Sequence, residues 1–328
     1  MKRRTVLQTI GIAALGAAAR ASASNNAQSA ASTTPDAPSA TSRKKTMQHL
    51  TLHNGVKMPI IGFGVFQIPP ADTQRAVSEA LQAGYRHIDT AASYMNEEAV
   101  GAAIKSSGLA RGDIFVTTKL WVQDYGYDNA LRAFDVSMKK LGLDVLDLYL
   151  LHKPYNDYYG AWRALERLYK EGRIRAIGVT SFWNERLADL FNCNEIKPMV
   201  NQIETNIWHQ QKAAGEFMAK HGIVHEAWAP FAEGKGDVFN NPAIKEIAAR
   251  HGKTAGQVML RWLVQRNVAV IPKTVRKERM AENIAIFDFT LDDADMQRIA
   301  ALDTGHSMIY DEMNPDMALG IGSHKIHD

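Results

Sequence analysis

The chain contains one cysteine, Cys193, among its 328 residues. No disulfide can form within the chain, so the fold does not depend on one in any cellular compartment. The histidines and this cysteine also lack the close spacing of zinc-binding motifs, and we expect no metal. Because Cys193 lies far from the amino terminus, a lipidated amino-terminal cysteine is excluded.

Net charge is small as well. Lysine and arginine exceed aspartate and glutamate by three, and four of the basic residues fall within the first 23 positions, without which the balance would be −1. A nearly neutral chain offers no general reason to expect nucleic acid or a membrane surface as a partner.

The first 23 residues have the three parts of an export signal, in order. Lys2-Arg3-Arg4 is followed by an apolar stretch from Ile10 to Ala19 that is too short for a permanent membrane span, and then by small residues ending at Ala23. Arg3-Arg4 before Thr5-Val6-Leu7 fits the twin-arginine type, which predicts export to the periplasm. The alternative is a basic start followed by an alanine-rich helix.

Residues 24–46 are mostly Ala, Ser, Thr, Asn and Pro, with almost no large apolar side chain. Such a composition cannot offset the entropy of ordering the chain, so it predicts a disordered, low-complexity linker. Met47 opens a segment of different composition. If translation began at Met47, the protein would lack the signal and stay in the cytoplasm.

Residues 47–328 read as a single α/β domain, a (β/α)₈ TIM barrel. Asn54-Gly55 between two short apolar runs indicates an amino-terminal β-hairpin with a tight type I′ turn, which would cap the bottom of the barrel. After it, strand-like runs alternate with periodic helical segments, which favours a parallel sheet closed on itself. The predicted strands are 60–66, 86–90, 114–119, 145–152, 174–180, 199–204, 223–229 and 268–273, and the predicted helices include 73–83, 129–141, 159–169, 212–221 and 254–265.

An open, doubly wound sheet is the competing fold. Gly62-Phe63-Gly64 is only a fragment of the dinucleotide-binding fingerprint, because no third glycine or helix start follows at the required place. The barrel is therefore preferred.

Four polar residues lie where predicted strands of the first half end: Asp89, Tyr94, Lys119 and His152. In a barrel of this kind the carboxyl ends of the strands meet at one mouth, where chemistry is done. An ammonium group lowers the pKa of a nearby phenol, so Lys119, held by Asp89, would make Tyr94 a usable proton donor. A neutral His152 would orient a carbonyl oxygen.

Each of these residues also has a purely structural interpretation. Tyr94 would then be an interface aromatic, Lys119 and Asp89 a structural ion pair, and His152 a core histidine with its hydrogen bonds satisfied. Their joint occurrence at consecutive strand ends favours the catalytic interpretation.

Four motifs carry a resemblance to a known family. They are Gly84-Tyr85-Arg86-His87-Ile88-Asp89-Thr90-Ala91, Lys119-Leu120-Trp121, Leu150-Leu151-His152-Lys153-Pro154 and Ile271-Pro272-Lys273-Thr274. With these motifs in this order, the chain resembles the aldo-keto reductases over residues 49–315. Within that family it is most similar to bacterial 2,5-diketo-D-gluconate reductases. The resemblance implies a (β/α)₈ barrel, NADPH bound without a Rossmann domain, Tyr94 as general acid, Lys119 and Asp89 as its supporting pair, and His152 as the orienting residue.

The segment after the eighth strand is rich in cations. Lys273, Thr274, Arg276 and Arg279 lie where such barrels often bind phosphate, and together they suit the 2′-phosphate of NADPH better than NADH. The alternative is a solvated run of charge. By resemblance, Glu282 and Asn283 reach the adenine.

The resemblance also assigns contacts to the nicotinamide. Trp228 matches the aromatic residue that stacks on the ring, although a core tryptophan is the alternative, and Gln202 matches a contact to the carboxamide. Thr180 and Ser181 occupy positions where the family usually has Ser-Asn, so one amide contact is missing. Asn206 likewise replaces a more usual histidine.

Phe66, Trp121 and the carboxyl-terminal loop from Gly305 to Met317 are candidates for the wall of the substrate pocket, the loop including Met308, Tyr310 and Met313. The tail is alternatively a disordered end.

The leading hypothesis is an NADPH-dependent reductase of small keto-sugars, dicarbonyls or aldehydes. As separate expectations, the protein is a monomer and its partner is a small-molecule carbonyl substrate. Two alternatives are a nucleotide-binding sensor or subunit with little turnover, and a Schiff-base lyase built on Lys119.

Overall fold

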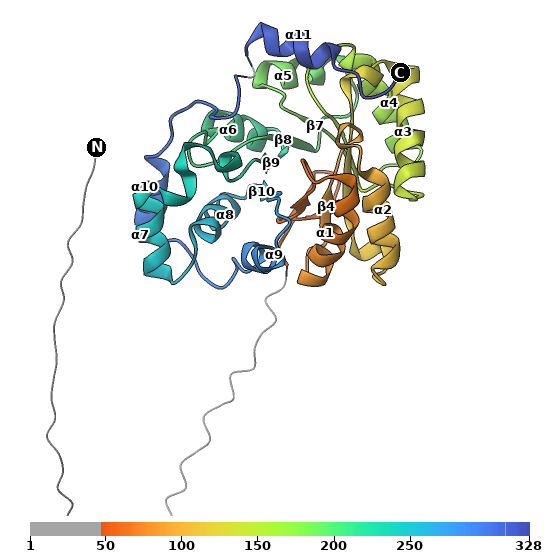
Figure 1. Cartoon of the computed structure of the whole chain (residues 1–328). Coiled ribbons are helices and arrows are strands. Elements are labelled where there is room, and N and C mark those ends of the chain that lie inside the picture. The colour runs from red at the N-terminus through yellow and green to blue at the C-terminus, as the bar shows by residue number, and fades with distance from the viewer. Residues whose placement is uncertain (1–46, 312) are drawn as a thin grey trace, which may run out of the picture. The chain divides into compact units, whose positions relative to one another are not determined.

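Eight parallel strands curve around a common interior in the computed structural model, which describes residues 47–311 and 313–328 (Figure 1). The strands pair in chain order from β3 to β10. They are β3 (Phe63–Gly64), β4 (His87–Asp89), β5 (Phe115–Leu120), β6 (Leu148–Leu151), β7 (Ile177–Thr180), β8 (Val200–Glu204), β9 (Val224–Trp228) and β10 (Ala269–Val270). The predicted signal segment and linker lie outside the described residues, so export and the Met47 start stay predictions.

The first and last strands meet and close the sheet. Ile61 forms a parallel bridge with Val270, and the amide of Gly62 donates to the carbonyl oxygen of Val270 at 2.8 Å. Further up, the amide of Gly64 donates to the carbonyl oxygen of Pro272 at 3.2 Å. The predicted (β/α)₈ barrel is therefore confirmed, and the open sheet is excluded because it would leave these edges unpaired.

The amino-terminal hairpin is present, but its turn differs from the predicted one. β1 (His49–Thr51) and β2 (Lys57–Pro59) pair in antiparallel fashion, with Leu50 opposite Met58. The connection runs from Leu52 to Val56, and within the Asn-Gly pair only Gly55 has a positive φ, of 88°. A type I′ turn needs positive φ at both central residues, so the predicted type I′ turn is wrong. The Asn54 side chain instead accepts a hydrogen bond from the amide of Val56 and donates to the carbonyl oxygen of Arg175.

Helices connect the strands and form the outer layer. The five helices predicted from periodicity are present, with slightly different ends, and further helices lie between other strands and after the last strand (Figure 1). They are α1 (Pro70–Ala83), α2 (Glu97–Ser106), α3 (Tyr127–Leu141), α4 (Tyr158–Lys170), α5 (Asn184–Cys193), α6 (Lys212–Lys220), α7 (Pro242–His251), α8 (Ala255–Gln265), α9 (Lys277–Ile284), α10 (Asp293–Ala300) and α11 (Pro315–Ser323). No helix among the described residues is long and apolar enough to cross a membrane.

Local sequence explains where these helices begin and end. α1 has Pro70 at its first position, where a missing amide hydrogen costs nothing, and ends at Gly84 with φ 106°, a conformation that glycine adopts readily. α8 begins with a capping box in which Thr254 and Gln257 satisfy each other's backbone amides.

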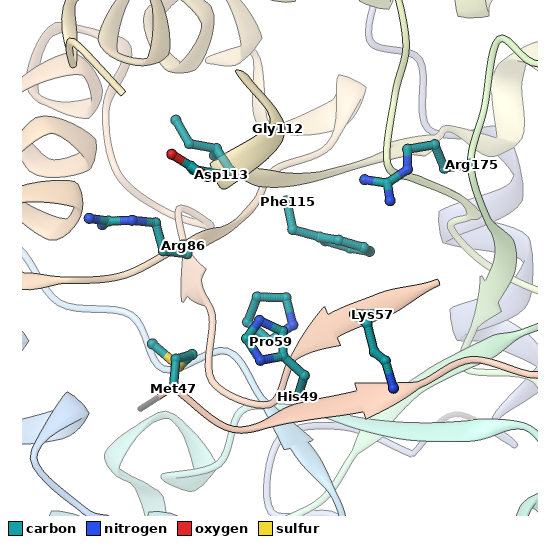
Figure 2. A pocket seen from close by; sticks show the side chains of 10 residues that line it. Met47, His49, Lys57, Pro59, Arg86, Gly112, Asp113, Phe115 and Arg175 are labelled. Carbon is teal, nitrogen blue, oxygen red and sulfur yellow. The ribbon is translucent and has the colours of Figure 1, made fainter. Parts of the chain in front are cut away.

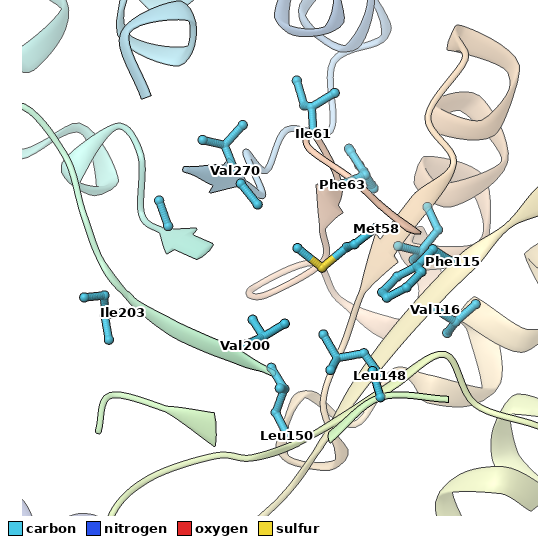
Figure 3. Packing of buried hydrophobic residues seen from close by; sticks show 14 of the residues in the cluster. Met58, Ile61, Phe63, Phe115, Val116, Leu148, Leu150, Val200, Ile203 and Val270 are labelled. Atoms are coloured by element: carbon cyan, nitrogen blue, oxygen red, sulfur yellow. The ribbon is translucent and has the colours of Figure 1, made fainter. Parts of the chain in front are cut away.

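The apolar core fills the interior of the barrel at the end where the parallel strands begin. Met58 from the hairpin points among side chains of the strands, including Phe63, Leu148 and Val200, and all four are fully buried (Figure 3). Parallel strands covered on both faces bury nearly every residue, which is why these strands read as continuous apolar runs in the sequence. The hairpin therefore closes the bottom of the barrel and leaves the other end for chemistry.

The contact between α2 and α3 supplies a test of the packing. A Cβ atom at Gly101 would lie well inside contact distance of the Leu141 carbonyl oxygen. Gly101→Ala should therefore lower the free energy of unfolding by about 1–3 kcal/mol, measured by urea denaturation. Gly320→Ala on α11 is the matched control, because its Cβ would meet nothing within 4 Å. Equal stability of the two variants would contradict this packing.

Candidate active site

The four polar residues predicted at strand ends do converge. Asp89 is the last residue of β4, Lys119 lies near the end of β5, and His152 directly follows β6. Tyr94 ends a short 3₁₀ turn, Ala92–Tyr94, that follows β4. Because β4, β5 and β6 are neighbours in the sheet, their carboxyl ends bring these side chains to one mouth of the barrel.

The ammonium group of Lys119 is at the centre of this group. Its Nζ donates to Asp89 Oδ1 at 2.5 Å, to the carbonyl oxygen of Thr90 at 2.9 Å and to the hydroxyl of Tyr94 at 3.4 Å. Lys119 has no exposed surface. Since an ammonium group has three hydrogens, this set of acceptors satisfies all of them.

His152 lies next to Tyr94. The two rings are 5.6 Å apart in an edge-to-face arrangement, and the Trp121 ring also meets the His152 ring edge-to-face, at 5.1 Å. His152 Nδ1 is 3.2 Å from the hydroxyl of Ser93. These contacts fix the orientation of the imidazole beside the phenol.

The net effect of the surroundings on Tyr94 is opposite to the predicted one. Burial raises the pKa of Tyr94, and the charge of Lys119, which lowers it, offsets only part of that increase. The prediction of a pKa lowered overall is therefore wrong. Lys119 does stabilise the phenolate, but its ammonium group is also bonded to Asp89. This stabilisation is smaller than the free energy that removing the phenolate from water costs.

The pKa values of the neighbouring groups support the predicted charge states. Burial lowers the pKa of His152 well below its ordinary value, and the charges of Lys119 and Lys153 add to the effect, so the imidazole is neutral near pH 7. Burial is the largest influence on the pKa of Lys119 and lowers it, but the charges of Asp89 and Tyr94 and the hydrogen bond to Asp89, among others, together outweigh burial, and the net shift is upward. Lys119 is therefore a charged ammonium, which argues against a Schiff-base lyase because that reaction needs a neutral amine.

Both predicted substrate-wall residues lie at this mouth. The Phe66 ring is 5.0 Å from that of Tyr94 and 48% of its surface is exposed. Trp121 is buried, and its Nε1 donates to the carbonyl oxygen of His324 at 2.8 Å. One aromatic residue thus faces solvent at the rim, whereas the other lies beneath the carboxyl-terminal tail.

Within the described residues the tail packs on the barrel, so its interpretation as a wholly disordered end is wrong. Tyr310 stacks on Trp228, with ring centroids 6.0 Å apart and 14° between the planes. Lys153 Nζ donates to the hydroxyl of Tyr310 at 2.5 Å and to Ser181 Oγ at 2.8 Å. Met308 and Met313 are exposed. The tryptophan that the resemblance assigns to the nicotinamide is therefore in contact with the tail in this structure.

The other residues predicted to contact the nicotinamide are buried at the same end of the barrel. Thr180 ends β7 and donates to the backbone carbonyl of His152, while the amide of Ser181 donates to the carbonyl oxygen of Gln202 at 2.9 Å. The side-chain amide of Gln202 donates to Asp89 Oδ2 and to Glu226 Oε2, each at 2.9 Å. Both of its N–H groups are thus used inside the protein, and only its Oε1 has capacity for a carboxamide donor.

The predicted phosphate-binding residues surround the start of α9, in the connection that follows β10. Lys273, Arg276 and Arg279 are exposed, and within the described residues none of their side chains forms an ion pair. The hydroxyl of Thr274 accepts from the amide of Arg276 at 3.1 Å. Cations at the amino end of a helix are a suitable site for a phosphate group, so the donor set fits NADPH.

The two predicted adenine contacts lie on the same helix. Glu282 is partly exposed, and its carboxylate accepts from the hydroxyl of Thr254 at 2.6 Å. Asn283 is buried. They therefore lie beyond the cationic residues along α9.

A separate cavity of about 290 Å³ lies at the opposite end of the barrel (Figure 2). Its wall includes Lys57, Arg86 and Arg175, with Phe115 at the start of β5. These residues belong to the amino ends of the strands, so this cavity does not adjoin the four converging residues. Within the described part of the chain, no group of three or more His, Cys, Asp or Glu side chains is placed to hold a metal ion.

Sequence reasoning missed two ionisable residues of this region, Glu226 and Lys153. Glu226 lies two positions before Trp228 on β9, and a period of two places both on one face of the strand. The available signal was an acidic residue in the middle of a strand that was predicted to be buried. Lys153 directly follows His152, and its contacts with the tail depend on segments far away in the sequence.

Comparison with known proteins identifies relatives of this barrel. A model of the aldo/keto reductase family matches residues 60–304. The chain is similar to glyoxal reductase from Bacillus subtilis, with 47% identity over 264 residues, covering 80% of this chain and 94% of the relative. It is also similar to methylglyoxal reductase DkgA from Yersinia pestis, with 43% identity over 264 residues, covering 79% of this chain and 95% of the relative.

Solved structures share the fold. The crystal structure of a Bombyx mori aldo-keto reductase in complex with NADP has a TM-score of 0.77 and 33% sequence identity, and the match covers 81% of this chain and 95% of the other. The crystal structure of an aldo/keto reductase from Brucella melitensis has a TM-score of 0.76 and 46% identity, covering 79% and 100% of the two chains.

The electrostatics of the mouth can be measured with histidine NMR. The hydrogen bond and charge of Asp124 raise the pKa of His327, whereas burial lowers that of His152. In a pH titration of ring nitrogen shifts, His327 should gain its proton above pH 6.5 and His152 should stay neutral throughout the range in which the fold persists. Asp124→Asn should lower the midpoint of His327 and leave His152 unchanged. A His152 signal that titrates near pH 6.5 would contradict the buried environment described here.

Proposed function

The chain belongs to the aldo/keto reductase family, and on this premise we propose that it is an NADPH-dependent reductase of small carbonyl compounds, with Tyr94 as the general acid. The observation that carries the proposal is the Lys119 ammonium, which contacts both the Asp89 carboxylate and the Tyr94 hydroxyl. A phenol is a weak acid, and a fixed cation next to its oxygen stabilises the phenolate left behind after proton transfer.

His152 and Tyr94 together would hold the carbonyl oxygen of the substrate. The imidazole is neutral, and in the tautomer with its proton on Nε2 the hydroxyl of Ser93, 3.2 Å away, donates to Nδ1. Nε2 then donates a hydrogen bond to the oxygen and orients it toward the hydroxyl of Tyr94. As negative charge develops on this oxygen, Tyr94 transfers its proton to it.

When bound, NADPH supplies the hydride that the carbonyl carbon receives. The protein's contribution is to bind, to orient and to transfer the proton. Lys119 remains charged during the step, because the carboxylate of Asp89 keeps its pKa raised. The three acceptors around Lys119 keep its Nζ in place while the charge on Tyr94 changes.

Small dicarbonyls are the substrate class that we propose. Two relatives, named glyoxal reductase and methylglyoxal reductase, cover most of the chain at more than 40% identity. Phe66 and Trp121 flank Tyr94 and His152, so the space next to the reacting oxygen is bounded by aromatic rings. Keto-sugars and aldehydes of similar size belong to the same proposal.

Removing the phenolic hydroxyl tests the assignment of the acid. Tyr94→Phe should lower kcat for methylglyoxal reduction by a factor of about 10²–10⁴, the usual contribution of general acid catalysis, while NADPH binding changes little. The measurement is the loss of NADPH absorbance at saturating substrate. Tyr127→Phe is the matched control, since this tyrosine is exposed on α3 and should keep full activity. Undiminished turnover by Tyr94→Phe would refute the mechanism.

The cofactor preference depends on the cations near α9. Arg276→Met should weaken NADPH binding by about tenfold or more, because a charge-assisted hydrogen bond to phosphate is lost, and should leave NADH binding nearly unchanged. Dissociation constants for both cofactors follow from quenching of tryptophan fluorescence. Arg163→Met, at another exposed position, is the control. If Arg276→Met weakened both cofactors equally, Arg276 would not be the residue that reads the 2′-phosphate.

A further inference from the structure

Beneath the four converging residues lies a second carboxylate that the proposed reaction does not use. Glu226 lies on β9 directly beside Gln202 on β8, and neither has more than 2% of its surface exposed. The amide nitrogen of Gln202 donates to Glu226 Oε2 and to Asp89 Oδ2, each at 2.9 Å. One side chain therefore joins Glu226 to the carboxylate that holds Lys119.

The charges in this cluster do not balance if both carboxylates are ionised. Asp89 forms a hydrogen-bonded ion pair with Lys119, whereas Glu226 forms none with that lysine among the described residues. The titratable or charged groups around Glu226 are Asp89 and His87 on β4 and Lys119 on β5. Its neighbours in register are Gln202 on β8 and, on β10, Ala269, which carries no charge.

The contacts of Glu226 leave room for a proton. Its Oε1 has no hydrogen-bond partner, and neither has His87 Nδ1, which lies 3.9 Å away. Both side chains have no exposed surface, and His87 Nε2 is already 2.9 Å from the hydroxyl of Thr117. An unpaired negative charge in such a dry place costs far more than an unpaired neutral acid group.

The titration behaviour of both groups agrees with this arrangement. Burial raises the pKa of Glu226 to about 8, and the negative charge of Asp89 adds to the effect. Burial lowers the pKa of His87 to about 4, so His87 supplies no compensating positive charge near neutrality.

We propose that Glu226 is a positioning residue of the reductase that is an uncharged carboxylic acid at neutral pH and whose ionisation in alkaline solution weakens proton donation by Tyr94. The proposal rests on the proposed function and extends it to a residue that contacts neither substrate nor cofactor. Through Gln202, the uncharged acid holds Asp89 without competing for Lys119.

The effect on Tyr94 follows from the charge that ionisation adds. With Glu226 neutral, Asp89 and Lys119 cancel; with Glu226 ionised, the cluster has a net charge of −1. This extra negative charge disfavours the phenolate and so makes Tyr94 a weaker acid. If only the enzyme with protonated Glu226 is active, kcat should fall by about tenfold for each pH unit above the pKa of Glu226.

Replacing the acid with its uncharged analogue tests the proposal. Glu226→Gln keeps the shape and supplies an N–H in place of the acid O–H, so kcat near pH 7 should stay within about threefold. The alkaline decline of kcat, measured with saturating methylglyoxal and NADPH, should move upward by at least about one pH unit. Glu97→Gln is the matched control, because Glu97 is also buried with a pKa raised by burial but bonds to Thr118 instead of the Asp89 cluster. The control should keep the wild-type pH profile.

Infrared spectroscopy gives a readout that does not depend on turnover. The wild-type protein without substrate should have a protonated-carboxyl band that is lost on titration around pH 8, and this band should be missing from the Glu226→Gln difference spectrum. If the wild type loses no such band around pH 8, or if the same loss persists in Glu226→Gln, the proposal is overturned. It is also overturned if Glu226→Gln and Glu97→Gln shift the decline of kcat equally, or if folded Glu226→Gln is inactive near pH 7.

The pH dependence of thermal stability also tests whether Glu226 is protonated at neutral pH. A carboxyl group whose pKa is raised on folding contributes stability that is fully present below its unfolded value of about 4.5 and is lost as pH rises toward 8. Across this window the Tm of the wild type should fall relative to that of Glu226→Gln, and the difference should level off above pH 8. The infrared titration and the Tm measurement need no catalysis, so they test the charge state of Glu226 separately from the acid role of Tyr94. If Tyr94→Phe stayed active while Glu226 titrated as expected, only the acid role of Tyr94 would be refuted.

Discussion

The ion pair between Lys119 and Asp89 is the interaction on which the rest of the site depends. Both side chains are buried, so neither charge would be stable there without the other. Three strands must be in register for the pair to form, because Asp89 ends β4, Lys119 lies on β5 and the supporting Gln202 comes from β8. The barrel thus places one ammonium beside one phenol, and Tyr94 obtains its electrostatic environment from that placement.

The division of the barrel into two ends follows from the same register. At the amino ends of the strands, the hairpin inserts Met58 and Leu52 into an apolar core, which provides stability. At the carboxyl ends, the strands present polar side chains that would be costly to bury individually. They are tolerated because each is bonded to another, as Gln202 is to both Asp89 and Glu226. The site is therefore a connected network rather than four separate residues.

Much of the fold was predictable because its signals are local. Alternating strands and helices, glycine and proline at helix ends and apolar runs in the strands all depend on neighbours in sequence. The predicted type I′ hairpin turn failed, since propensity at Asn54 was overridden by its hydrogen bonds to Val56 and to the distant Arg175. The helical tail was missed as well, because its position depends on contacts such as that of Trp121 with His324.

The sequence by itself determined the barrel and the polar residues at its strand ends, because strand and helix periods, and motifs at strand ends, are visible along the chain. Only the tertiary structure decided the net pKa shifts of Tyr94 and Glu226. The net pKa of Tyr94, the protonation of Glu226 and the stacking of Tyr310 on Trp228 depend on how far water is excluded and on which distant group lies nearby. Asp89 and Gln202, for example, are 113 residues apart and share a hydrogen bond. Desolvation and Coulomb interactions act through space, so no local pattern in the sequence reports their sum.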